Sequence, residues 1–420
     1  MEEKERKPKI RFKGFTEAWE QRKVNDLLEL LTDYDANGSF ADMANNVNTY
    51  DGSGYAWYVR MTDLENNEPL TKLKYVDKSS YDFMKKTHLF GGELLMAKRG
   101  EIGKVYIFQP RTRFATVAPN MYLLKLNKNV IPRFLHSFFI SDYGNSKLQE
   151  INASTTMGAI YKDDVKNIEL KIPNISEQEK IGDVFERIDN LITLHQRKYD
   201  KLVNVKKALL EKMFPKNDSN VPEIRFKGFT EAWEQRKLID IVDFTRGRGL
   251  SWNDITDKGI NECILYGHLY TDYGMVIKDV KYRTNVEKNT MVLSQFGDVL
   301  IPSSDTTPTG LARATSVDKT GVILGGDINV LRPKKDNGDF ISYSINANKK
   351  ELLKRIKGTT VRHLNNSDLE DVEIKIAPNV EEQKNISDTL TKLDNLITLH
   401  QRKLEKLKNI KKSLLEKMFV

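Results

Sequence analysis

Two short segments contain the residue types that a metal-dependent nuclease uses. Glu169 and Lys171 are separated by one residue, and Glu373 and Lys375 repeat this spacing in the second half of the chain. Residues two apart on a β-strand point to the same side, so each pair could present a carboxylate and an ammonium group to a metal ion. The alternative is an ordinary strand with buried apolar residues and solvated charges. We favour the ordinary strand, because no convincing Pro-Asp partner precedes either pair.

Motifs for other chemistries are incomplete or missing. The segment GEIGK at Gly100–Lys104 lacks the glycine spacing and the following Ser or Thr of a phosphate-binding loop, so we interpret it as a β-turn with basic residues. We find neither the Gly-rich turn nor the aromatic Asn/Asp-Pro-Pro-Tyr-type motif that an adenine methyltransferase needs. The six histidines show no zinc-ligand spacing. We therefore predict no catalytic residue, no metal ion and no cofactor in this chain.

A near-identical duplication organises the chain. The 27 residues Ile188–Phe214 return as Leu393–Phe419 with only six differences. Apolar residues recur in both copies with the three-four spacing of a long amphipathic helix, and the likeliest partner for each stripe is the other copy. The first stripe contains Ile181, Val184, Ile188, Leu191, Leu202, Val205 and Leu209, with Phe185 and Ile192 beside it. The second contains Ile386, Leu390, Leu393, Leu396, Ile397, Leu404, Leu407, Ile410, Leu414 and Met418.

A second repeat frames two unlike inserts. Ile10–Lys23, reading IRFKGFTEAWEQRK, is identical to Ile224–Lys237, whereas the inserts Val24–Pro173 and Leu238–Pro378 differ strongly. Both inserts contain short β-rich runs punctuated by Gly, Asn and Asp, followed by a helical segment. Preserved frames around divergent inserts indicate that frame and insert have different tasks. The predicted division is 1–173, the first insert with its N-terminal segment; 174–216, a central helix; 217–378, the repeated frame with the second insert; and 379–420, a distal helix.

Length and charge limit the class of protein. A chain of 420 residues exceeds what one hydrophobic core usually organises, so two or more domains are expected. A net charge of +8 suggests a polyanionic partner. There is no readable signal peptide or membrane span, and the single Cys263 can form no internal disulfide. We expect a cytoplasmic protein without a membrane partner.

The layout of a short frame, a variable insert, an Ile-Pro strand, Glu-Gln and a long helix ending in LLEKMF, present twice, resembles the DNA specificity subunit of Type I restriction-modification enzymes. The resemblance covers essentially the whole chain. It implies an α+β fold with two mostly-β target recognition domains, accessory helices, an antiparallel coiled coil of the two long helices and a pseudo-two-fold internal repeat.

The resemblance also implies a function. Each recognition domain would read one half of a bipartite site in double-stranded DNA, without catalysis by this chain. Two methyltransferase (modification) subunits and two restriction (motor-nuclease) subunits would assemble on it and would use S-adenosylmethionine, ATP and Mg. The alternatives are a self-contained DNA methyltransferase or nuclease, or a structural coiled-coil spacer. Missing cofactor motifs disfavour the first, and the size of the inserts disfavours the second.

Residues for DNA contact are expected in the loops of the inserts. Phosphates require cations, while base edges are read by Arg, Lys, Asn, Gln and Ser. The candidates in the first insert are Arg60, Lys98, Arg99, Lys104, Arg111 and Arg113. Those in the second insert are Arg246, Arg248, Ser303, Ser304, Arg313 and Arg362.

Overall fold

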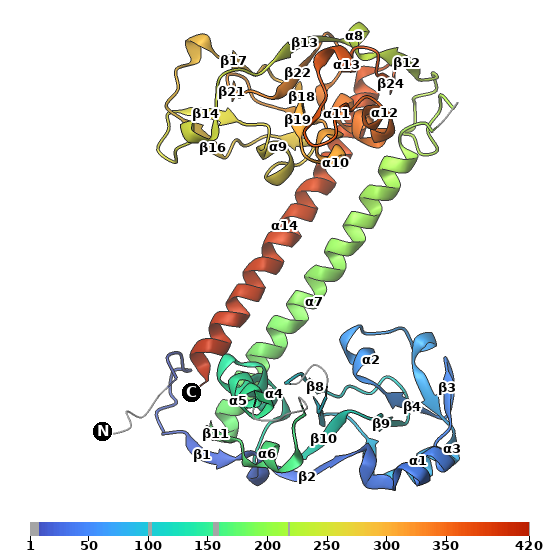
Figure 1. Cartoon of the computed structure of the whole chain (residues 1–420), viewed down its shortest axis with the longest axis vertical. Coiled ribbons are helices and arrows are strands. Elements are labelled where there is room, and N and C mark those ends of the chain that lie inside the picture. Colours follow the sequence, from blue (N-terminus) through green and yellow to red (C-terminus); the bar gives the residue numbers. More distant parts are fainter. Residues whose placement is uncertain (1–7, 100–102, 154–158, 217–218, 420) are drawn as a thin grey trace. The chain divides into compact units, whose positions relative to one another are not determined.

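The structure is a computed structural model that describes residues 8–99, 103–153, 159–216 and 219–419 (Figure 1). It consists of two compact units: unit 1 contains Met1–His195 with Lys403–Val420, and unit 2 contains Gln196–Arg402. Segment 1–173 therefore lies in unit 1 and segment 217–378 in unit 2, while both long helices are divided between the units. Residues 100–102 of the GEIGK segment lie outside the described residues, so the predicted turn stays a prediction.

Unit 1 holds the first insert, which is the first of the two expected recognition domains. Its strands are β1 (Glu20–Lys23), β2 (Leu28–Asp33), β3 (Thr49–Asp51), β4 (Ala56–Val59), β5 (Lys74–Val76), β6 (His88–Leu89), β7 (Leu94–Ala97), β8 (Val105–Ile107), β9 (Ala115–Val117), β10 (Met121–Leu126) and β11 (Glu169–Ile172). Its helices are α1 (Phe40–Asn46), α2 (Met61–Glu65), α3 (Lys78–Phe83), α4 (Pro132–Ile140), α5 (Asp142–Ala153), α6 (Lys162–Asn167) and the first part of α7 (Ile175–Lys212).

Unit 2 holds the second recognition domain. Its strands are β12 (Glu234–Lys237), β13 (Val242–Arg246), β14 (Asn261–Ile264), β15 (Val276–Ile277), β16 (Tyr282–Thr284), β17 (Val292–Leu293), β18 (Asp298–Pro302), β19 (Ser304–Asp305), β20 (Thr315–Val317), β21 (Ile323–Leu324), β22 (Ile328–Pro333), β23 (Arg362–His363) and β24 (Glu373–Ile376). Its helices are α8 (Leu238–Ile241), α9 (His268–Thr271), α10 (Pro308–Leu311), α11 (Gly338–Ala347), α12 (Lys349–Leu353), α13 (Asn366–Leu369) and the first part of α14 (Val380–Met418).

The sheets of the two units follow one plan. In unit 1 the strands of the main sheet are ordered β2-β10-β7-β8, and in unit 2 the order β13-β22-β18 begins a five-stranded sheet that continues through β20 to β15. Each unit adds a second, mixed sheet, ordered β3-β5-β4-β9-β6 in unit 1 and β16-β14-β21-β17 in unit 2. The expectation of two mostly-β inserts with a shared fold is confirmed.

The repeated frame closes each insert at its base. β1 pairs antiparallel with β11, and β12 pairs with β24 in the same register. Along β11, Glu169 is exposed, Leu170 and Ile172 are buried and Lys171 is half-buried, and β24 has the same pattern. An ordinary alternating strand is therefore confirmed. Because entry and exit strands are hydrogen-bonded to each other, each insert is built as a self-contained body.

Both long helices form as predicted, but they begin earlier than the 27-residue repeat. Ile181 and Phe185 of α7 are buried in the core of the first recognition domain, and Ile386 and Leu390 of α14 are buried in that of the second. Ile188 of α7 is buried as well. Some residues of the predicted stripes are exposed in the middle of each helix. The exposed positions, with their exposed fractions, are Leu191 (43%), Val205 (38%), Leu396 (44%) and Ile410 (39%). Burial along the middle of the stripes is therefore uneven, since Leu404 is only 5% exposed.

Within each unit the two helices pair in opposite directions. In unit 1, Phe185 packs on Phe419, with ring centroids 6.1 Å apart, and Asp189 accepts a bond from Lys411 at 2.6 Å. In unit 2, Lys206 forms an ion pair with Asp394, and Phe214 lies in one core cluster with Ile386 and Leu390. Residue numbers rise along one helix as they fall along the other, which is an antiparallel arrangement. Each unit therefore takes the far end of the other half's helix into its core.

Candidate nucleic-acid interface

In the second recognition domain β13 and β18 end on either side of the start of β22, and we call this place the strand-end junction. Ser303 follows β18, and its amide donates to the carbonyl of Asp327 at 2.8 Å. Its carbonyl accepts from the amide of Leu364 at 3.0 Å, so that β19 pairs with β23 directly beyond it. Arg246 is the last residue of β13 and donates from Nη2 to Ser303 Oγ at 3.1 Å and to Asp327 Oδ1 at 2.9 Å.

The first recognition domain builds the same junction from its backbone. The amide of Lys98 donates to the carbonyl of Asn120 at 3.0 Å, and the carbonyl of Lys98 accepts from Ile160 at 3.2 Å. Asn120 and Asp327 both have positive φ, at 71° and 60°, a conformation that Asn and Asp tolerate better than most side chains. The bridge between Arg99 and Ala159 matches the pairing of Ser304 with His363. Lys98 is thus the structural counterpart of Ser303.

The side chains at the two junctions are different. Asp33 and Arg246 are counterparts, because Asp33 is opposite Tyr122 on β10 and Arg246 is opposite Asn329 on β22, and both Tyr122 and Asn329 donate to the carbonyl of the matching residue after the junction. An acidic residue, Asp33, in the first domain thus occupies the position of a basic residue, Arg246, in the second. The backbone is kept and the charge is reversed.

The junction of unit 1 is an internally neutralised cluster. Asp33 accepts from Lys98 at 3.0 Å and from Lys162 at 2.8 Å, and Lys98 also donates to Asp35 at 2.7 Å. Burial by itself would raise the pKa of Asp33, but the hydrogen bonds and charges of Lys162 and Lys98 outweigh it and lower the pKa. Burial opposes the charge on Lys98 as well, yet its two acidic partners raise its pKa. The Lys98 side chain is only 13% exposed, so its charge is mostly satisfied inside the domain.

The strand-end junction of unit 2 is more exposed to solvent. The Arg246 side chain is 51% exposed and that of Asp327 is 47% exposed, while Ser303 beneath them is buried. Ser304 and Arg362 are half-buried, and the side chain of Arg248 is exposed two residues after Arg246. The structure therefore brings four of the six sequence-predicted residues of this insert together: Arg246, Ser303, Ser304 and Arg362, with Arg248 nearby. Arg313 lies apart. Its guanidinium donates to the carbonyl of Tyr273, and burial lowers its pKa.

The candidates of the first insert divide into two groups. Lys98 and Arg99 belong to the junction. Arg60, Lys104 and Arg111 instead surround α2 and the loop after it: Arg60 binds Asp63, Lys104 binds Glu65 and Arg111 donates to the carbonyl of Glu68. Arg113 is exposed and lies over the ring of Phe114. The contacts of Arg60, Lys104 and Arg111 place a second group of cations beside α2.

Selecting cations and serines from the sequence missed the acids that position them. Asp33 and Asp327 hold Lys98 and Arg246, respectively, but neither is a cation, and neither lies in a recognisable motif. The one trace in the sequence is an Asn or Asp directly before a buried strand, at Asn120 and Asp327. Such residues mark positive φ at a turn, and both junctions use one.

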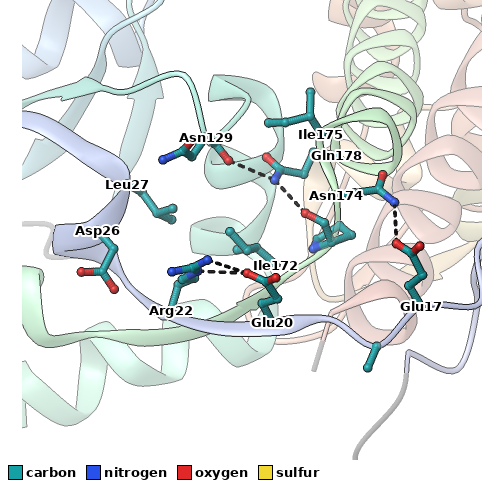
Figure 2. Close-up of a pocket in the computed structure, with 12 residues that line it drawn as sticks. Glu17, Glu20, Arg22, Asp26, Leu27, Asn129, Ile172, Asn174, Ile175 and Gln178 are labelled. Carbon is teal, nitrogen blue, oxygen red and sulfur yellow. Dashed lines mark hydrogen bonds and ion pairs between the residues drawn. The ribbon is translucent and has the colours of Figure 1, made fainter.

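A cavity of about 300 Å³ lies in unit 1 where the frame meets the start of α7 (Figure 2). Glu17, Glu20 and Asp26 line it, together with Arg22, which is bound to Glu20 at 2.6 Å. Because acidic side chains predominate, this cavity is unsuited to a phosphate backbone. It is therefore not a candidate for the nucleic-acid interface.

The Glu-Gln pair at the start of each long helix fixes the frame. Arg11 makes two 2.8 Å hydrogen bonds to the fully buried carboxylate of Glu177, and Arg225 binds Glu382 in the same way. Gln178 accepts from the amide of Ile131 at 2.9 Å and donates to the carbonyls of Asn129 and Pro173, as Figure 2 shows for the latter two bonds. The repeated residues therefore hold frame, recognition domain and helix together.

Neither a metal centre nor a membrane helix is found in the parts of the chain that the structure describes. No group of three or more His, Cys, Asp or Glu side chains there could hold a metal ion. No helix among them is long and apolar enough to cross a membrane.

Comparison with known proteins identifies the family. The model of the Type I restriction modification DNA specificity domain matches twice, over residues 16–204 and 230–409. The chain belongs to this family: it is a DNA specificity subunit of the Type I restriction-modification class with two target recognition domains.

Individual relatives are distant in sequence. A putative Type I restriction enzyme MjaX specificity subunit of Methanocaldococcus jannaschii is 23% identical over 409 residues, covering 95% of this chain and 92% of the relative. The MjaVIII specificity subunit of the same organism is 23% identical over 302 residues, covering 69% and 70%. The crystal structure of the Type I restriction-modification S subunit of M. genitalium matches with a TM-score of 0.59 and 14% identity, covering 99% of both chains. That structure supports the fold.

Proposed function

We propose that this chain reads a bipartite site in double-stranded DNA, with one half-site per recognition domain. The observation that supports this most directly is the pair of junctions: one backbone arrangement, present twice, bears side chains of opposite charge. A shared scaffold with unlike donors and acceptors is suited to reading two unlike sequences, because base edges differ in their pattern of donors and acceptors. The repeated frame gives both domains the same attachment.

In this proposal the chemistry belongs to partner subunits. Two modification subunits methylate adenine, and two restriction subunits move and cut the DNA. These partners would use S-adenosylmethionine, ATP and Mg, and this chain would need no cofactor of its own. The mid-helix residues that stay half-exposed in both copies give partners apolar surface on either helix.

The test is methyl transfer with defined components. The purified chain is incubated with DNA and labelled S-adenosylmethionine, without and with the modification subunit. We expect no transfer by the chain alone and methylation of one bipartite sequence by the complex, read by sequencing the methylated sites. Methyl transfer by the chain alone, or methylation without a split sequence, would contradict the proposal.

A further inference from the structure

The two strand-end junctions differ most in how their cations are held. In unit 1, Lys98 is 13% exposed and two carboxylates bind it. In unit 2, half of the Arg246 side chain is exposed although Ser303 and Asp327 hold it in place. Arg246 therefore combines two properties that a surface arginine rarely has together: a fixed direction and an accessible guanidinium.

An arginine that is held in one direction by hydrogen bonds is better suited to contact a nucleobase than a phosphate. Both hydrogen bonds leave from Nη2, and Nε and Nη1 make none to another residue that the structure describes. Asp327 stands beside it with 47% of its side chain exposed, and a carboxylate there repels the phosphate backbone. The major-groove edge of guanine has two acceptors, O6 and N7, and arginine is their commonest protein partner. The paired cytosine presents an amino group that can donate a hydrogen bond to a carboxylate.

We propose that Arg246 is a specificity-determining residue of the second recognition domain and that it reads a guanine of a G·C pair. Ser303 and Asp327 act as positioning residues that fix the guanidinium. This inference rests on the proposed function, since it assigns one contact within the half-site read by unit 2. The counterpart in unit 1 is Asp33, which is 8% exposed, so the first domain cannot make this contact at the matching position.

The test uses the complex of the full chain with its modification subunits. Exchange of the second insert first identifies which half-site belongs to unit 2. Each guanine of that half-site is then replaced, one at a time, by 7-deazaguanine, which lacks the N7 acceptor. We expect one replacement to weaken binding about tenfold in the wild-type complex, because a good bidentate contact is worth about 1–3 kcal/mol.

The variants give the decisive comparison. In Arg246→Ala the same 7-deazaguanine should cause no further loss, and the base at that position should become relaxed among the methylated sites, while the other half-site stays unchanged. Arg246→Lys keeps the charge and should keep part of the discrimination. Asp327→Asn and Ser303→Ala should reduce it by loosening the arginine. The matched control is Arg236→Ala on frame strand β12, whose arginine binds Glu234 and should leave the discrimination unchanged.

Three results would overturn the inference. They are a unit 2 half-site without guanine, an Arg246→Ala complex that keeps both the base preference and the 7-deazaguanine effect, and an equal loss of binding to all sequences, which would indicate a phosphate contact. In each of these cases the wild-type complex still methylates a bipartite site. A wild-type complex that does not do so overturns the proposed function and this inference with it.

Discussion

The base of each recognition domain and its strand-end junction differ in what the two units share. At the base, Arg11 with Glu177 and Arg225 with Glu382 make the same bidentate bonds. At the junction the backbone bonds are equally alike, but Asp33 in one unit replaces Arg246 in the other. The base keeps the same side chains in both units, while the junction keeps the same backbone hydrogen bonds with Asp33 in one unit and Arg246 in the other. Recognition can change without a change of fold.

The largest expected effect comes from exchanging a whole insert. Replacing Val24–Pro173 with the insert of another family member should change one half-site completely and leave the other intact, because the entry and exit strands of the insert close it at its base. Sequencing the methylated sites of the complex measures this. The matched exchange of Leu238–Pro378 should change the other half only. Altered bases in both halves after one exchange would show that the domains share a reading surface.

Next in size is the loss of the buried carboxylate at the base. Glu177→Ala leaves the Arg11 guanidinium without its buried partner, and unpairing such a charge costs about 3 kcal/mol of unfolding free energy. Hydrogen exchange should show unit 1 destabilised and unit 2 unchanged. Glu382→Ala should give the reverse, and Glu179→Ala, at an exposed position of α7, should alter neither. Equal loss in both units would mean that they unfold as one.

A smaller effect is expected at the junction of unit 1. Asp33→Asn should lower the free energy of unfolding by about 1–2 kcal/mol at pH 7, because it removes a charged acceptor from two lysines. The folded pKa of Asp33 is lowered, so this stabilisation is present above the unfolded pKa of about 4 and is lost as the pH falls through the folded pKa.

Chemical denaturation at pH 7 and at about pH 3 tests the sign. The difference in stability between Asp33→Asn and the wild type should shrink at the lower pH. Asp35→Asn is the control, since that side chain is 69% exposed and should matter by less than about 0.5 kcal/mol. The same difference in stability at both pH values would show that ionisation of Asp33 does not contribute to the pH dependence of stability.

The smallest effects should distinguish the two copies of one interhelical ion pair. Asp394 accepts from Lys206 and also from the Tyr343 hydroxyl at 2.8 Å, whereas Asp189 and Lys411 form the simpler, more exposed pair. Lys206→Ala should lower the free energy of unfolding by about 1–2 kcal/mol, and Lys411→Ala by less than about 1 kcal/mol, as measured by chemical denaturation. The neighbouring exposed lysines provide controls in Lys207→Ala and Lys412→Ala. A larger loss at Lys411 would show that Tyr343 adds nothing to the network.

The apolar stripes of the two long helices are buried at some positions and exposed at others. The period places Ile188 and Leu191 on one apolar face of the helix, and the structure buries the first and leaves the second 43% exposed. Spacing along a helix defines a face, but it does not say how far along that face a neighbouring domain extends. Only the packing of the recognition domain on the helix decides this.

The sequence by itself determined the duplication, the two β-rich inserts, the long helices and the family, because these depend on local period, turn residues and repetition. Tertiary structure decided which residues meet. Arg11 finds Glu177 across 166 residues, and Asp33 and Arg246 become counterparts through backbone hydrogen bonds that leave no mark on side-chain identity. A strand position is defined by its partners in the sheet, so two residues of opposite charge can occupy one position, and their equivalence appears only when the strands have paired.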